Sequence, residues 1–239
     1  MSWGRLLLLS TSLPRLTAGL TDRPIIGILT VPTSDGAEGC ITRRRRRLAR
    51  DDSSSPATTA SCFHSYYADW LESAGARVVA IPCTAPPSRL DELFDAVNGV
   101  LFTGGEEGLA TNSTYYRAAR RLFDRAVGAA AAGDRVPIWG SCMGFQLLCL
   151  LASGDDQSVL TRGAFAAEGL MLALDLVEPA AARSPLLGRA SAADAAGDGA
   201  VRERVAAVLA SENVTVNFHH DGVEPVSYTH LTLPTTPYV

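Results

Sequence analysis

A thiol flanked by glycines is the group in this sequence best suited to covalent chemistry. Cys142 lies in the segment 140–144, Gly-Ser-Cys-Met-Gly, directly after the apolar run 136–139. A strand that ends in G-x-C-x-G and continues into an apolar helix is typical of a nucleophile elbow, a tight turn that lifts one side chain above a sheet. The helix N-terminus favours the reactive thiolate. We therefore predict that Cys142 is a nucleophile; a buried structural cysteine is the alternative.

Apolar strands alternate with amphipathic helices around this thiol. We expect strands at 25–29, 78–81, 100–102 and 136–139, and helices at 66–74, 90–97, from Thr114 onward, at 145–151 and at 201–209. Repeated strand–helix units predict an α/β fold, with three αβα layers and a mostly parallel sheet covered on both faces. Sites in such sheets form at the carboxyl ends of strands, where Gly104, Gly105 and Cys142 fall.

Length and composition are those of one ordinary globular domain. The chain has 239 residues, 47% hydrophobic and 19% charged, with a net charge of −4, which indicates no polyanionic partner such as nucleic acid. All 21 basic residues are arginine. We therefore interpret the arginine run 43–47 as part of a solvated loop over 39–60, with a nucleic-acid or membrane patch as the alternative.

The N-terminal segment 1–19 is predicted to be a signal peptide. It carries Arg5 and Arg15 and no acidic residue, and its leucine stretch is too short to span a bilayer. An organellar transit peptide fits less well. Glycosylation sequons at Asn112 and Asn213 are compatible with the secretory route that we expect.

The cysteines indicate neither a zinc site nor a bound cofactor. The chain has five, and no pair has the C-x-x-C spacing of metal or redox motifs. An odd number in an exported protein leaves at least one free thiol, which we assign to Cys142. Cys149 falls two helical turns deeper on roughly the same face, and we expect it to be buried.

Several blocks of the sequence together resemble the gamma-glutamyl hydrolases, members of the class I glutamine amidotransferase-like superfamily. These blocks are residues 23–29, 71–79, 98–105, 139–145 and 217–219. They occur in the order of that family and span roughly 23–223. The resemblance implies a flavodoxin-like domain, which we place at 20–224.

This resemblance implies cleavage of the γ-linked glutamate tail of folylpoly-γ-glutamates. Cys142 would attack the γ-amide carbonyl and form a thioester that water hydrolyses. The backbone N–H groups of Met143, Gly104 and Gly105 would bind the oxyanion. We expect no cofactor or metal, and from the N-terminal segment a lysosomal, vacuolar or extracellular destination. Assembly of the protein as a homodimer is a further hypothesis.

Two positions bear on this assignment. Gln146 stands where the family usually has an acidic residue, and glutamine amidotransferases often have glutamine there. An amidotransferase therefore stays open, although the chain shows no acceptor-substrate domain. Tyr67 matches an aromatic position of the family; we expect it to pack in the core, and lining of the substrate pocket is the alternative.

A general base is the part of the mechanism that the sequence leaves uncertain. The family places its histidine in a Trp-His-Pro-Glu segment that this sequence lacks. His219 matches the Asn-Phe-His histidine near the substrate, and His220 is the remaining candidate base. The segment 225–239 has no acidic residue, arginine or alanine. We interpret it as a non-native tail on a truncated member; a non-catalytic binding homologue is the third hypothesis.

Overall fold

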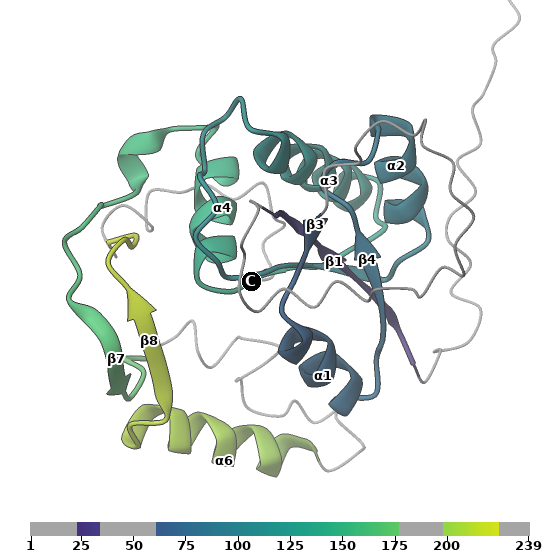
Figure 1. Cartoon of the computed structure of the whole chain (residues 1–239). Coiled ribbons are helices and arrows are strands. Elements are labelled where there is room, and N and C mark those ends of the chain that lie inside the picture. Colours follow the sequence, from purple (N-terminus) through teal and green to yellow (C-terminus); the bar gives the residue numbers. More distant parts are fainter. Residues whose placement is uncertain (1–22, 34–60, 177–197, 225–239) are drawn as a thin grey trace, which may run out of the picture.

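Four parallel strands form the central sheet of this protein (Figure 1). The computed structural model describes residues 23–33, 61–176 and 198–224. In spatial order the strands are β4 (Arg77–Ile81), β1 (Ile25–Leu29), β5 (Gly99–Phe102) and β6 (Ile138–Gly140). Numbered along the chain, this order is 2-1-3-4, that of flavodoxin-like doubly wound sheets. The predicted α/β fold with a parallel sheet is confirmed.

The two middle strands are the most deeply buried part of the sheet. Ile28 and Leu29 are inaccessible to solvent, and all four residues of β5 are buried. Strands that are covered on both faces consist of continuous apolar residues, as β1 and β5 do here. Both were expected from the sequence, at 25–29 and 100–102.

Helices cover both faces of the sheet. Helix α1 (Ser65–Ser73) lies on one face, where Tyr67 packs with Ile28 and Leu101. The opposite face carries α2 (Pro87–Asp95), α3 (Thr114–Ala131) and α4 (Met143–Ala152), as Figure 1 shows. These layers agree with the predicted three-layer arrangement.

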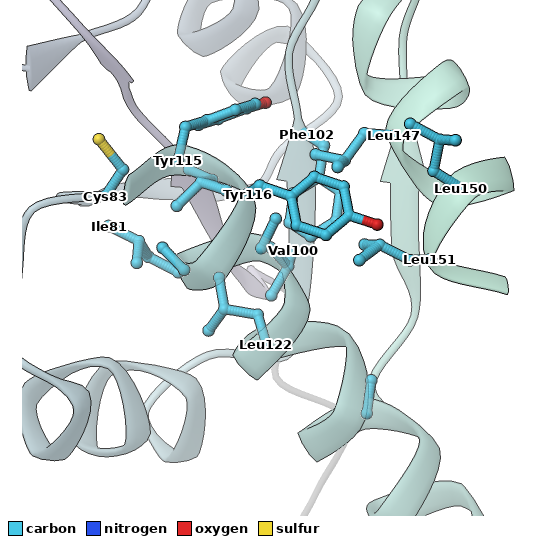
Figure 2. Close-up of a cluster of buried hydrophobic side chains, with 14 of the residues drawn as sticks. Ile81, Cys83, Val100, Phe102, Tyr115, Tyr116, Leu122, Leu147, Leu150 and Leu151 are labelled. Atoms are coloured by element: carbon cyan, nitrogen blue, oxygen red, sulfur yellow. The ribbon is translucent and has the colours of Figure 1, made fainter. Parts of the chain in front are cut away.

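The larger core lies between the sheet and the helices α2, α3 and α4. Figure 2 shows the Tyr116 ring of α3 between Phe102 of β5 and Leu151 of α4, with Leu122 of α3 below Val100 of β5. The side-chain oxygen of Ser113 accepts a hydrogen bond from the Tyr116 N–H, which fixes the start of α3. The buried residues of α3, among them Ala119 and Leu122, face the sheet and the neighbouring helices.

Two antiparallel ribbons accompany the central sheet. The strands β2 (Val31–Pro32) and β3 (Ser61–Cys62) form a short one. The larger one, called the β7–β8 ribbon below, pairs β7 (Ala167–Leu172) with β8 (Thr215–His219). A 3₁₀ turn, η1 (Gln157–Val159), precedes this ribbon, and α6 (Asp198–Ser211) lies between its two strands in the sequence.

The last strand of the sheet begins later than the sequence predicted. We expected it at 136–139, but β6 begins at Ile138. Pro137 lacks an N–H group and therefore cannot donate to the ladder, although its carbonyl accepts from the Val100 N–H at 2.9 Å. The following helix in turn begins at Met143, directly after Cys142, rather than at Phe145.

Several expectations concern residues outside those that the structure describes: the signal peptide 1–19, the arginine run 43–47 and the tail 225–239. Within the described ranges, no helix is both long and apolar enough to cross a membrane. The same ranges contain no group of three or more His, Cys, Asp or Glu side chains placed to hold a metal ion.

Candidate active site

The backbone turns sharply at Cys142, between β6 and α4. Cys142 has φ 50° and ψ −113°, a conformation that costs a residue with a side chain on the order of 1–3 kcal/mol. Ser141 anchors the turn, because its N–H donates to the Phe102 carbonyl at 3.0 Å. The Cys142 carbonyl then accepts from the N–H groups of Phe145 and Gln146, so α4 begins immediately. Cys142 is therefore exposed at a strained strand-to-helix turn.

The two elbow glycines permit close packing rather than an unusual φ. Neither Gly140 nor Gly144 has a positive φ. A Cβ atom on Gly144 would overlap the Phe102 carbonyl, and one on Gly140 would lie 2.7 Å from the Phe145 nitrogen. The absence of both side chains lets the first turn of α4 lie directly against the ends of β5 and β6.

The loop after β5 contacts the elbow. A Cβ atom on Gly104 would lie 3.1 Å from the Cys142 Cβ, and one on Gly105 would lie 3.5 Å from the Met143 Cε. Within the described part of the chain, no hydrogen bond uses the N–H of Gly105 or of Met143. These two N–H groups therefore have no hydrogen-bond partner among the described residues.

Tyr67 reaches this loop from helix α1. Its hydroxyl oxygen accepts the Gly104 N–H at 2.7 Å, so this N–H already has a protein partner. Burial raises the pKa of the Tyr67 hydroxyl well above its ordinary value, and the phenol therefore stays neutral. Tyr67 packs in the core, as the sequence predicted, and its polar end also borders the site.

Cys142 opens into a cavity of about 740 Å³. One wall consists of the elbow, the Gly104–Gly105 loop and the start of α1. The other wall is the end of β8 with the residues that follow it, 221–223, and Phe165. A cavity of this size suits a small-molecule ligand.

Only one of the two adjacent histidines lines this cavity. His219 does so; its Nδ1 lies 3.1 Å from the Asp221 carbonyl oxygen and its Nε2 lies 3.3 Å from the Asn217 Oδ1. His220 instead places its Nε2 2.6 Å from the Glu168 Oε1, and its side chain is 60% exposed. Successive side chains along an extended chain point to opposite sides. The structure therefore does not bring His220, our candidate base, into the cavity.

Gln146 and Asp221 hold the two walls together. The Gln146 Nε2 donates to the Asp221 carbonyl oxygen at 2.9 Å. A carboxylate oxygen of Asp221 accepts from the Gly163 N–H at 2.8 Å, and the bridge between Thr161 and Gly222 continues the contact. Asp221 escaped sequence analysis because its contact to Gln146 is through the backbone, which leaves no signal in the residue type.

The remaining cysteines have other environments. Cys62 is disulfide-bonded, while Cys83, Cys142 and Cys149 are free. Cys83 and Cys149 are buried, and burial raises the pKa of both thiols, to about 11 for Cys149. Cys142 is the only exposed free thiol among the described residues.

Comparison with known proteins places these features in context. A profile of the family Peptidase C26 matches residues 40–163, slightly more than half of the chain. Over 90 residues the chain is 43% identical to a gamma-glutamyl hydrolase of Mus musculus, covering 38% of this chain and 28% of that protein.

Longer alignments have lower identity. The chain is 34% identical over 153 residues to a gamma-glutamyl hydrolase of Rattus norvegicus, covering 64% of this chain and 43% of that protein. It is likewise 34% identical over 159 residues to gamma-glutamyl hydrolase 1 of Arabidopsis thaliana, covering 66% and 40%. The chain thus spans less than half the length of these curated relatives.

Proposed function

The chain belongs to the Peptidase C26 family, and we propose that it acts on γ-glutamyl bonds with Cys142 as the nucleophile. The observation that carries this proposal is the exposed thiol on a strained turn, which opens into a cavity near two N–H groups that have no partner among residues 23–33, 61–176 and 198–224. The names of the similar mouse, rat and Arabidopsis proteins support the bond type. Folylpoly-γ-glutamates are the substrate that we propose.

The proposed reaction proceeds by acyl transfer to sulfur. The Cys142 thiolate attacks the γ-amide carbonyl carbon, and the resulting oxyanion accepts hydrogen bonds from the N–H groups of Gly105 and Met143. Collapse breaks the C–N bond, and the leaving amine takes the proton that the general base removed from the thiol. Water then hydrolyses the γ-glutamyl thioester, which restores the thiol. The Gly104 N–H can join as a third donor if it exchanges its bond to Tyr67.

A general base must deprotonate the thiol and later activate water. Three histidines are described: His64 does not line the cavity, His220 is bound to Glu168 outside it, and both ring nitrogens of His219 face oxygen atoms. The sequence also lacks the Trp-His-Pro-Glu segment that the resemblance implies. We therefore propose that this polypeptide has the nucleophile and the two described walls of the substrate pocket, and that it turns over little substrate without a base.

The glutamine at position 146 was the reason to keep a glutamine amidotransferase as an alternative function. Its side-chain amide donates to the Asp221 carbonyl oxygen, which gives this glutamine a structural role. The match to the Peptidase C26 family supports the hydrolase over the amidotransferase. Release of ammonia from glutamine would restore the amidotransferase hypothesis, whereas release of glutamate from a γ-linked peptide supports the hydrolase.

We also propose a secretory destination. The disulfide at Cys62 supports it, because disulfide bonds persist in oxidising compartments. We expect the mature protein, with its Cys62 disulfide formed, in the medium or in an acidic organelle of the source cell. Cell fractionation with an antibody to residues 61–176 measures this directly.

Thiol alkylation tests the proposed nucleophile. Over residues 61–176, native protein treated with iodoacetamide should gain one label, on Cys142, since Cys62 is disulfide-bonded and Cys83 and Cys149 are buried. A folate with a γ-linked glutamate tail should slow this labelling at least severalfold by occupying the cavity. Peptide mass spectrometry locates the label, and the Cys142→Ala variant should remain unlabelled until it is unfolded.

The matched control is Cys149→Ala, which should label like the parent. Labelling of Cys142 that is unaffected by saturating folate polyglutamate would contradict the proposed substrate. Equal labelling of Cys149 in the native protein would contradict the assignment of Cys142 as the accessible thiol.

A further inference from the structure

We infer that Glu106 is a specificity-determining residue of the cavity, because its carboxylate opposes the carboxylates that flank the scissile γ-glutamyl bond. Glu106 lines the cavity and is exposed to solvent. It directly follows Gly105, whose N–H group we propose as an oxyanion donor. Consecutive Cα atoms are about 3.8 Å apart, so the Glu106 side chain begins beside the proposed position of the scissile carbonyl. The inference rests on the proposed function, because it concerns a ligand of the same cavity.

The Glu106 carboxylate has no counter-charge in the described part of the chain. No hydrogen bond or ion pair uses its side chain there, no arginine lines the cavity there, and the sequence has no lysine. The other carboxylate of the described lining, that of Asp221, is compensated. One of its oxygen atoms accepts from the Gly163 N–H at 2.8 Å, and the other lies 3.5 Å from the Arg162 Nη1. Glu106 therefore contributes an uncompensated negative charge to the cavity.

The next residue, Glu107, faces a different environment. It does not line the cavity. Its carboxylate lies near the side chains of Cys83 and Tyr115, which are 1% and 0% exposed, and its negative charge adds to the effect of burial in raising the pKa of both groups. Two adjacent residues thus carry the same charge, and only Glu106 presents it to a ligand beside Cys142.

The proposed ligand is anionic at the same place. Each residue of a γ-linked glutamate tail keeps a free α-carboxylate, so negative charges lie on both sides of every γ-amide bond. Like charges repel, and at physiological ionic strength this repulsion acts over about 8 Å. Glu106 should therefore weaken the binding of ligands that carry these carboxylates. A γ-glutamyl amide of the same shape with uncharged groups in their place escapes this penalty.

Two dipeptides of equal shape and different charge test the inference. The probes are N-acetyl-γ-glutamylglutamate, which is a polyanion, and its analogue with every carboxyl group converted to a carboxamide. The acetyl group reproduces the acylated nitrogen of a residue inside a γ-linked tail. Binding is measured calorimetrically in the Cys142→Ala background, which prevents turnover.

Glu106→Gln is the test variant, because it removes the charge and keeps the shape of the side chain. Glu107→Gln is the matched control, since Glu107 does not line the cavity. We expect Glu106→Gln to bind the anionic dipeptide about three- to tenfold more tightly than its parent. Binding of the carboxamide analogue should be unchanged, which also shows that the cavity is still folded. Glu107→Gln should change neither affinity.

The dependence on salt separates repulsion between charges from a change of shape. At about 1 M salt the screening length falls to about 3 Å, so the advantage of Glu106→Gln over its parent should shrink toward zero. A purely structural role of Glu106 would not produce this dependence.

Four results would overturn the inference. One is equal binding of the anionic dipeptide to Glu106→Gln and its parent, and another is an equal gain in Glu107→Gln. The others are a gain that persists at high salt and a gain that extends to the carboxamide analogue. Each leaves the proposed function standing, whereas failure of the parent and both variants to bind either dipeptide would contradict the function itself.

Discussion

At the scale of single residues, hydrogen bonds around the elbow hold the backbone of Cys142 in a strained conformation. Cys142 adopts a positive φ although it carries a side chain, and its neighbours keep it there. The restraint comes from the Ser141 bond to the Phe102 carbonyl and from the start of α4. Such strain persists only where the surrounding structure determines it, and it is most common at functional sites.

Gly144 has no room for a side chain. In Gly144→Ala the new methyl group would overlap the carbonyl of Phe102, which belongs to a buried strand and cannot move aside. We expect a loss of about 3 kcal/mol in the free energy of unfolding, measured by urea denaturation.

Gly128→Ala is its matched control. Gly128 lies in α3, and a Cβ atom there meets nothing within 4 Å. Alanine at this position should stabilise the protein by about 0.5–1 kcal/mol. A Gly144→Ala protein as stable as the parent would contradict the close packing at the elbow.

At the scale of elements, the site depends on how the β7–β8 ribbon docks on α4. The ribbon is not part of the central sheet, and the Gln146 side chain and the Thr161–Gly222 bridge hold its end in place. The orientation of His219 depends on the same docking, because its Nδ1 contacts the carbonyl that accepts from Gln146. A change at the contact between α4 and the ribbon should therefore alter the far wall of the cavity.

Gln146→Glu tests this docking. A carboxylate at this position would face the Asp221 carbonyl oxygen, and two acceptors repel, so we expect a cost of about 1–3 kcal/mol. Hydrogen exchange should accelerate at the amides of Thr161 and Gly222 while α3 stays protected. Gln157→Glu is the control, since the exposed Gln157 only accepts from Arg162. Equal exchange in both variants would refute the role of Gln146.

The sequence predicted these elements with uneven success, for physical reasons. β1 and β5 were predictable because buried parallel strands are continuous apolar runs, and α3 because its buried residues repeat with helical spacing. The strand β7 was missed. Most of its residues are exposed, so its Leu170 and Met171 follow no alternation that separates a buried face from a solvent face.

At the scale of the molecule, the topology brings the loop after β5 and the loop after β6 to the same edge of the sheet. Their parallel pairing made the approach of Gly104 and Cys142 predictable from the sequence. The position of His220 was not predictable in this way. Which of two adjacent histidines points inward depends on the register of β7 with β8, and that register is a tertiary property. The roles of Cys142, Gly104, Gly105, Met143 and His219 stay predictions.

Global stability should fall in alkali because of Cys149. Burial raises the pKa of this thiol to about 11 in the folded protein, from an ordinary value of 9.0. The stabilising contribution is complete below pH 9, where the thiol is protonated in both states. It is lost as the pH rises toward 11, because the unfolded chain releases the proton first.

Urea unfolding at pH 8 and pH 10.5 measures this loss. Cys149→Ala should show a smaller decrease between the two pH values than the parent, while the other ionisable groups contribute equally to both proteins. An identical decrease in the parent and the variant would show that Cys149 does not contribute.

The far wall of the cavity is made from a segment that follows Cys142 by many residues. Because ribosomes add residues in order, the reactive sulfur emerges before the ribbon that will confine it. During that interval the thiol is open to any electrophile or oxidant nearby. The nascent chain can therefore select among reactants only after β8 has been synthesised and has packed beside Cys142.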